Sequence, residues 1–186
     1  MFVALLYSEK SKLGLPTPDF SLGSVEGKTY RLDDFSNKKV LAVFFICSHC
    51  PYVLAIEDRI LSLWRDLKNQ SVQFVGICSN DSTDYPEDSP PNLFKRWKEK
   101  GYGFPYLIDE AQTAAKAYGA VCTPDIFVFD EKRRLAYHGQ FDDNWKDPKS
   151  VTRQDLREAI ELLLTGQSPQ TPQMPSMGCS IKWHKS

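Results

Sequence analysis

The chain has little of the features that would mark several other classes of protein. None of its apolar runs approaches the ~20 residues that a membrane-spanning helix needs. Its net charge is only −1 over 186 residues, so no electrostatic attraction favours nucleic acid or an anionic membrane, and we expect neither as a partner. The sequence has no internal repeat and no linker-like segment inside it, which favours one domain large enough to build its own core.

The sequence also has little that is typical of a secreted protein. The apolar stretch at residues 2–7 is too short for the hydrophobic region of a signal peptide, and no basic segment precedes it. The five cysteines are an odd number, whereas a secreted disulfide framework usually shows an even count in a smaller chain. We therefore expect a cytoplasmic protein whose thiols are kept reduced.

The most informative motif is Cys47-Ser48-His49-Cys50, which directly follows the apolar run 40–46. Two cysteines three residues apart, between a buried strand and a helix, are typical of a redox dithiol. Residues i and i+3 share one face of a helical turn, and the positive end of the helix favours a thiolate. We expect Cys47 to be the nucleophile and Cys50 the resolving thiol. The alternatives are two structural thiols, or half of a zinc site that lacks its second ligand pair.

Hydrophobic periodicity predicts an alternation of strands and helices along the chain. We expect a hairpin over residues 19–32, buried strands at 39–46 and 72–78, a strand at 105–109, and a hairpin from 125–129 and 135–139. Helices are predicted at 51–69, 91–100, 111–118 and 155–164, with glycines closing the last two. This pattern predicts an α/β sandwich over residues 1–166 with a mixed sheet. Residues 167–186 are rich in Pro, Gln and Ser and are predicted to form an irregular tail.

Four segments together resemble a known family. They are residues 16–22 ahead of the first hairpin, the run Cys47-Ser48-His49-Cys50-Pro51-Tyr52-Val53, the tripeptide Thr123-Pro124-Asp125, and residues 178–183 (Gly-Cys-Ser-Ile-Lys-Trp). The chain resembles the thioredoxin fold in its redoxin branch, the alkyl hydroperoxide reductase/thiol-specific antioxidant family, and within it a peroxiredoxin-like or thioredoxin-like subgroup. The resemblance implies a thioredoxin-like sandwich with helices flanking a mixed central sheet and an N-terminal hairpin extension. It further implies that Pro124 is cis and that Thr123 faces the dithiol, offering backbone groups to an extended substrate.

The chain departs from two patterns of these relatives. Aligning a peroxidatic cysteine with Cys50 places Cys47 and Val43 where peroxiredoxins carry Thr or Ser and Pro, which weakens a peroxidase reading. Thioredoxin has a buried Asp where this chain has Leu41, so another proton acceptor is needed, and Asp81 is a candidate. The leading hypothesis is a thiol–disulfide oxidoreductase. The alternative is a thiol-dependent peroxidase with an antioxidant role in cell redox homeostasis, and the third is a copper-binding module that uses His138.

Further residues have a functional and a structural interpretation each. His49 either stabilises the Cys47 thiolate or faces solvent. Cys122, two residues before Pro124, is either a third redox thiol or a packed free cysteine, and Cys179 is either a resolving thiol or an inert exposed one. We expect no cofactor and no metal. The expected partners are a protein or small-molecule disulfide and a recycling thiol reductant, and the protein is expected to be a monomer or a homodimer.

Overall fold

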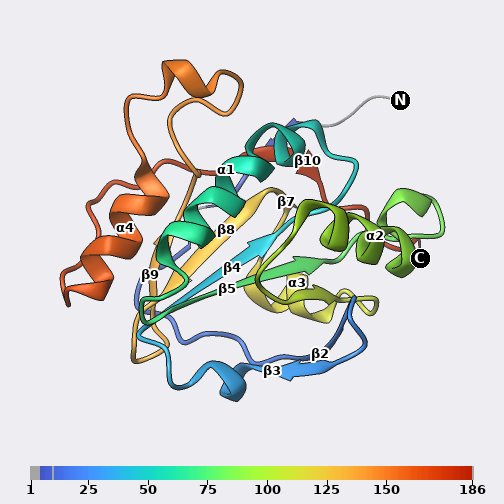
Figure 1. Ribbon diagram of the computed structural model, residues 1–186, viewed down its shortest axis with the longest axis horizontal. Helices are drawn as coiled ribbons and strands as arrows, with labels where there is room; N and C mark the ends of the chain where they lie inside the picture. The colour runs from blue at the N-terminus through green and yellow to red at the C-terminus, as the bar shows by residue number, and fades with distance from the viewer. Residues whose placement is uncertain (1–4, 10, 186) are drawn as a thin grey trace.

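The computed structural model describes residues 5–9 and 11–185. Most of the core is built on a seven-stranded mixed sheet with the order β3-β2-β6-β5-β4-β8-β9 (Figure 1). The central strands β4, β5 and β6 are parallel, and the outer pairs β8–β9 and β2–β3 join antiparallel. The strands are β2 Ser21–Ser24, β3 Thr29–Arg31, β4 Val40–Phe45, β5 Val72–Cys78, β6 Tyr106–Ile108, β8 Asp125–Phe129 and β9 Leu135–His138.

Helices cover both faces of this sheet, as the alternation of side chains along β4 requires. Val40, Ala42 and Phe44 pack into a core with residues of α1, α2 and α4. Leu41, Val43 and Phe45 point to the other face and pack with α3 and the first hairpin. The helices are α1 Pro51–Leu67, α2 Pro90–Lys100, α3 Thr113–Tyr118 and α4 Asp155–Leu164, with the 3-10 turns η1 Leu32–Phe35, η2 Pro86–Asp88 and η3 Pro148–Ser150.

A second, three-stranded sheet forms from segments that are far apart in the sequence. Strand β10 (Met177–Ser180) lies between β1 (Leu5–Tyr7) and β7 (Cys122–Thr123), antiparallel to both. The prediction of an irregular tail over 167–186 is therefore wrong at residues 177–180, which form β10. The segment is buried because Cys179 joins one hydrophobic core and Ile181 joins the other. Figure 1 shows β10 beside the N-terminal end of α1.

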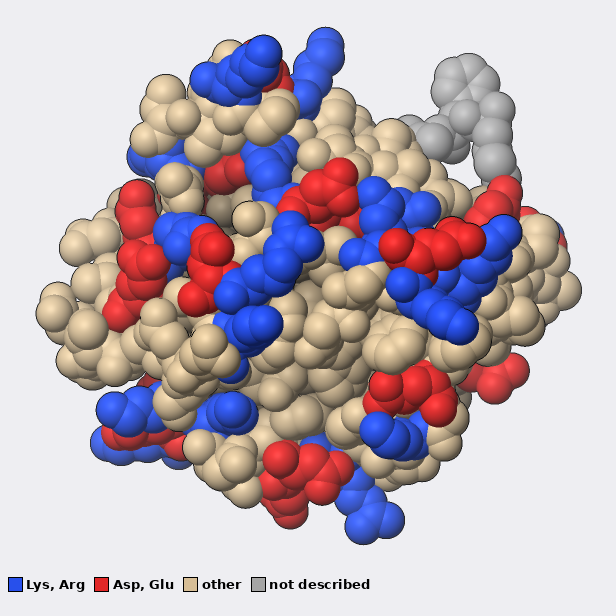
Figure 2. Space-filling model, in the orientation of Figure 1, with Lys and Arg blue, Asp and Glu red and all other residues tan. Residues whose placement is uncertain are grey.

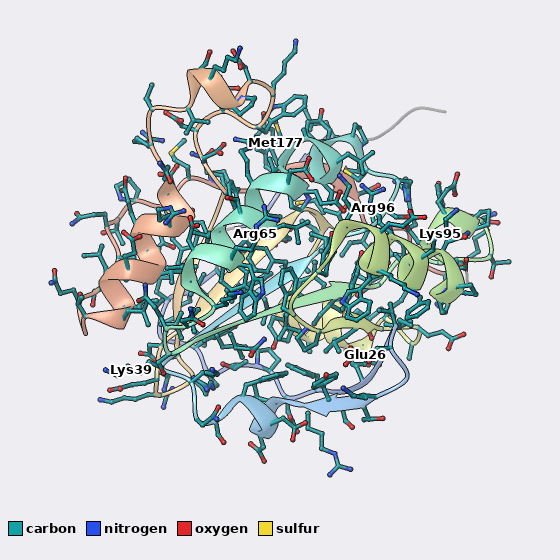
Figure 3. The ribbon with its side chains drawn as sticks, viewed as in Figure 1. Glu26, Lys39, Arg65, Lys95, Arg96 and Met177 are labelled. Atoms are coloured by element: carbon teal, nitrogen blue, oxygen red, sulfur yellow. The ribbon has the colours of Figure 1, made fainter. Side chains whose placement is uncertain are left out.

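Polar contacts tie α1 to α2 on the outside of the sheet. Glu57, which is almost fully buried on α1, accepts hydrogen bonds from Arg96 Nε at 2.7 Å and from Tyr102 Oη at 2.7 Å. Figure 3 shows Arg96 reaching from α2 toward α1. Both signs of charge are interspersed over the face in Figure 2, without a large area of one sign. Among the described residues, no helix combines the length and the apolarity that crossing a membrane demands.

The predicted fold class is confirmed: the chain is a thioredoxin-like α/β sandwich with a mixed central sheet. The predicted hairpin at its N-terminal side forms β2 and β3, and it extends the central sheet because β2 also pairs with β6. The predicted glycine cap of α3 is likewise found, since Gly119 has φ 69° in the left-handed region.

Candidate active site

The Cys47-Ser48-His49-Cys50 motif spans the turn between β4 and α1 rather than the first turn of the helix. Helix α1 begins at Pro51, and Cys50 is its N-cap residue, with extended dihedrals of φ −73° and ψ 122°. Proline suits the first helical position and disfavours helical geometry in the residue before it. The prediction that helical i, i+3 spacing brings the two sulfurs together is therefore wrong, because Cys47 lies outside the helix.

Three thiols meet at the N-terminal end of α1. The Sγ atom of Cys50 lies 2.7 Å from the Sγ atom of Cys179, and the Cys47 and Cys50 thiols are hydrogen bonded to each other. All three are buried, with exposures of 0% for Cys50, 1% for Cys179 and 2% for Cys47. The three sulfurs are free thiols. The predicted contact between Cys47 and Cys50 thus exists, and β10 adds a third sulfur to it.

Hydrogen bonding favours the thiolate form of Cys50 within this group. The thiols of Cys179 and Cys47 donate to its sulfur, and so does the backbone N–H of Val53, and these contacts hold the pKa of Cys50 well below its ordinary value. Burial, followed by its hydrogen bond to Cys50, raises the pKa of Cys47. The prediction that Cys47 carries the reactive thiolate is corrected accordingly, because the helix N-terminus that stabilises an anion belongs to Cys50.

The loop before β8 faces the thiols, as predicted. The Thr123–Pro124 peptide bond is cis. The carbonyl oxygen of Thr123 lies 3.0 Å from Cys50 Sγ and accepts its S–H in the thiol form. The Thr123 hydroxyl lies 3.4 Å from Cys47 Sγ. Asp125 holds this loop in place. Its carboxylate accepts a hydrogen bond from the backbone N–H of Val121 and binds His138 Nε2 at 2.7 Å.

A buried carboxylate that sequence reasoning missed holds the motif in place. Asp88 of η2 accepts hydrogen bonds from the Ser48 backbone N–H at 2.7 Å and its hydroxyl at 2.8 Å, and from Asn80 Nδ2 at 2.7 Å. Its other contact is His49 Nδ1, at 2.8 Å. Burial opposes ionisation of Asp88, but the hydrogen bonds from His49 and Asn80 outweigh it and keep its pKa below the ordinary value. Nothing in the local sequence around residues 86–88 marks this role.

His49 lies in the site but turns toward Asp88. Its hydrogen bond to that carboxylate raises the pKa of the imidazole, and its ring stacks on Tyr85 with centroids 5.0 Å apart. The prediction that His49 stabilises the Cys47 thiolate directly is corrected, because its hydrogen bond goes to Asp88 and the thiolate is on Cys50.

The remaining candidates occupy separate positions. Asp81 accepts a hydrogen bond from the Thr83 backbone and pairs with His184 at 3.2 Å, so it serves its own loop and the C-terminal segment instead of accepting a proton from Cys50, contrary to the prediction. Cys122 is fully buried in β7, where its Sγ lies 3.5 Å from the Pro124 carbonyl oxygen. Burial raises the pKa of this thiol, which fits a packed cysteine. Cys179 is not in an exposed tail but in a buried strand at the site.

One group of described residues has ligand atoms close enough to hold a metal ion. Cys47, His49 and Asp88 offer one atom each, all within 4.8 Å of one another. The hydrogen bond from His49 to Asp88 already satisfies two members of this group. His138, the residue invoked for copper, is not in the group, since its Nε2 binds Asp125 beneath the loop.

Comparison with known proteins agrees with this geometry. The sequence model of the AhpC/TSA family matches residues 13–138. The Thiol-disulfide oxidoreductase ResA of Bacillus thuringiensis subsp. konkukian (strain 97-27) is 28% identical over 129 residues, which span 68% of this chain and 69% of that protein.

Two solved structures extend the comparison to the whole fold. An uncharacterized conserved protein from Geobacillus kaustophilus is 40% identical with a TM-score of 0.95, and the match covers 100% of both chains. A thiol:disulfide interchange protein of the thioredoxin family from Chlorobium tepidum TLS has a TM-score of 0.64 at 19% identity, over 83% of this chain and 99% of that one. At that identity the second likeness concerns the fold alone.

Proposed function

The chain belongs to the AhpC/TSA family, and from this premise we propose that it is a thiol–disulfide oxidoreductase whose redox couple is Cys50 and Cys47. The observation that carries the proposal is the Cys50 sulfur at the N-cap of α1, where neighbouring thiols and a backbone N–H stabilise its thiolate. A thiolate is the species that attacks disulfides. The similarity to a protein named as a thiol-disulfide oxidoreductase supports the same activity.

The chemistry balances within this site and its substrate. The Cys50 thiolate attacks one sulfur of a substrate disulfide, forming a mixed disulfide and releasing the other substrate sulfur as a thiolate. That thiolate takes up the proton that Cys47 loses. The Cys47 thiolate then attacks Cys50, which releases the second substrate sulfur as a thiolate and leaves a Cys47–Cys50 disulfide. The substrate gains two electrons and the protein loses two, which a thiol reductant returns in a second round of exchange.

A cavity at Pro124 of the loop that faces the cysteines supports a protein as substrate. It has a volume of about 230 Å³ and is lined by Tyr52, Pro124, Trp145 and Met177 among others. Tyr52 and Trp145 rings lie 4.4 Å apart at its wall, and Figure 3 shows Met177 near the N-terminal end of α1. Such a pocket takes an apolar side chain next to the cysteine of an extended polypeptide, while the Thr123–Pro124 loop lies along its backbone. We place this exchange in the cytoplasm, where thiols stay reduced.

The peroxidase alternative has less support from the site. Val43 points into the core on the α3 face, and Cys47 occupies the position where the family's activating hydroxyl stands. The only hydroxyl that contacts Cys47 among the described residues is that of Thr123. Peroxide consumption and disulfide reduction by the same preparation therefore separate the two functions.

The test is reduction of insulin disulfides by the purified chain with dithiothreitol as the recycling reductant. We expect turnover by the wild type and a loss of at least about a hundredfold in Cys50→Ser, because the pKa values of the other four cysteines are raised. Cys78→Ser is the matched control, since Cys78 is a buried thiol at the end of β5, and it should keep the activity. Full activity in Cys50→Ser, or peroxide consumption without disulfide reduction, would overturn the proposal.

A further inference from the structure

Cys179 reaches the active site because β10 is fixed on both sides. Leu5 of β1 and Thr123 of β7 are its register partners, so the strand cannot slide without breaking both ladders. Gly178 allows the close approach: a Cβ at this position would lie 2.0 Å from the Thr123 carbonyl oxygen. The strand is thus held directly against the loop that faces Cys50.

The sulfur of Cys179 lies within reach of a covalent bond to Cys50. The separation of 2.7 Å between the two Sγ atoms exceeds the length of an S–S bond by only about 0.7 Å. The two residues are 129 positions apart in sequence, so tertiary structure alone creates this contact. At this distance a disulfide between the two sulfurs requires only a small movement of either side chain.

The protonation states of the pair suit an exchange in which Cys50 is the shared sulfur. The hydrogen bond to Cys50 and then burial raise the pKa of Cys179, so this thiol keeps its proton while Cys50 is ionised. The pKa of Cys47 is also raised, by burial and then by its hydrogen bond to Cys50. Cys50 thus lies between two other thiols, Cys47 before α1 and Cys179 on β10, and both favour its ionised form.

We propose that Cys179 is a second disulfide partner of Cys50, so that the redox centre is a three-thiol relay rather than a dithiol. The proposal rests on the proposed function and deepens it. Cys179 attacks the mixed disulfide at Cys50 and forms a Cys50–Cys179 disulfide. Cys47 then displaces Cys179 and forms the Cys47–Cys50 disulfide.

Each step of the relay conserves electrons. After Cys50 has formed a mixed disulfide, the departing substrate thiolate accepts the proton of Cys179. The Cys179 thiolate attacks Cys50, the bond from Cys50 to the substrate breaks, and the second substrate sulfur leaves as a thiolate. Cys47 next attacks Cys50, which forms the Cys47–Cys50 disulfide and returns Cys179 to the thiol, with its proton supplied by Cys47. The net change is the same two-electron oxidation of the protein.

Peptide mapping distinguishes the two disulfides without ambiguity. Trypsin leaves Cys47 and Cys50 together in residues 40–59, whereas Cys179 falls in residues 158–182. A Cys50–Cys179 bond therefore cross-links two peptides, and a Cys47–Cys50 bond stays within one. The experiment oxidises the full chain with one equivalent of diamide, quenches with iodoacetamide at increasing times and identifies the peptides by mass spectrometry.

We expect the cross-linked pair to form in the wild type and to become the main oxidised product in Cys47→Ser. In Cys179→Ser only the bond within residues 40–59 should form, and the double variant Cys47→Ser/Cys179→Ser should form neither and should trap a mixed disulfide with insulin. Cys122→Ser is the matched control, because Cys122 lies beside Cys179 in the same small sheet and should not change the products.

Absence of the cross-linked pair from both the wild type and Cys47→Ser overturns the relay. Cys47→Ala serves if the serine variant does not fold. Such a result leaves the proposed function standing as long as Cys50→Ser is inactive in the insulin assay, so the two failures are distinguishable. Equal trapping of the mixed disulfide by Cys47→Ser and by the double variant would likewise exclude resolution by Cys179.

Discussion

The Nδ1 atom of His49 lies 2.8 Å from Oδ2 of Asp88, so the imidazole between the two active-site cysteines is bound to a carboxylate of η2. The Asp88 side chain is fully buried, whereas one fifth of the His49 side chain remains exposed. The pair anchors the turn that carries the cysteines, because the same carboxylate also binds the backbone of Ser48. The charge beside the active site is thus balanced within the protein before any substrate arrives.

Replacing Asp88 with Asn should change the ionisation of its neighbours in known directions. The imidazole loses the hydrogen bond that raises its pKa, so the pKa of His49 should fall toward the ordinary value of about 6.5, as followed by NMR titration. Asp88 also raises the pKa of Cys47 by its charge, so that of Cys47 should fall, as followed by the pH dependence of alkylation in Cys50→Ser. Asp33→Asn, an exposed acid on η1, is the control and should move neither value.

The same pair should make stability depend on pH above the ordinary pKa of histidine. Because the pKa of His49 is raised in the folded state, its contribution is complete below about pH 6.5 and is lost as pH rises through the folded value. Partial exposure of His49 limits the effect to about 1 kcal/mol or less. Urea unfolding of the reduced protein at pH 6 and pH 8 should show a smaller decrease in His49→Gln than in the wild type. An equal decrease in both would show that the pair does not contribute.

The central sheet and its helices could be predicted because their signals are local. Residues 40–46 form one continuous apolar run, which is typical of a strand covered on both faces, and β4 is buried throughout. The helix after Pro51 follows from the recurrence of apolar residues at helical spacing, and its buried face includes Val53, Ile56 and Ile60. Resemblance to the redoxin family supplied what periodicity could not, namely the loop at Thr123 and Pro124.

The small sheet and the polar anchor of the site could not be predicted for a physical reason. Residues 177–180 (Met-Gly-Cys-Ser) show no strand pattern, and their pairing depends on partners more than 50 residues away. The contacts of Asp88 with Ser48 and His49 likewise join residues 40 and 39 positions apart. Cys179 was recognisable as a candidate from its motif, but its distance from Cys50 is a property of the tertiary structure alone.

Trp145 should matter for protein substrates and not for small disulfides. Its ring packs against Tyr52 at the wall of the cavity next to Pro124. Removing an aromatic anchor from a binding pocket typically weakens binding by about 1 kcal/mol or more. Trp145→Ala should therefore raise KM for the reduction of insulin at least about fivefold. The reduction of 5,5′-dithiobis(2-nitrobenzoic acid) should be unchanged. Trp183→Ala, at an exposed tryptophan outside this cavity wall, is the control. An equal effect of Trp145→Ala on both substrates would contradict a role in binding.

Gly178 should control the approach of β10 to the active site. In Gly178→Ala the new Cβ would lie 2.0 Å from the Thr123 carbonyl oxygen and 2.5 Å from its carbon, so either β10 or the loop must move. Such overpacking typically costs about 1–3 kcal/mol, which urea unfolding of the reduced chain measures. The displacement should also lengthen the contact of Cys179 with Cys50, so the pKa of Cys50 should rise, as followed by thiolate absorbance at 240 nm. Gly23→Ala on β2 is the matched control, because a Cβ there meets no atom within 4 Å, and it should leave both the stability and the absorbance titration near those of the wild type. If Gly178→Ala lowers stability while the titration of Cys50 stays in place, the strand packs against the loop without tuning the thiolate.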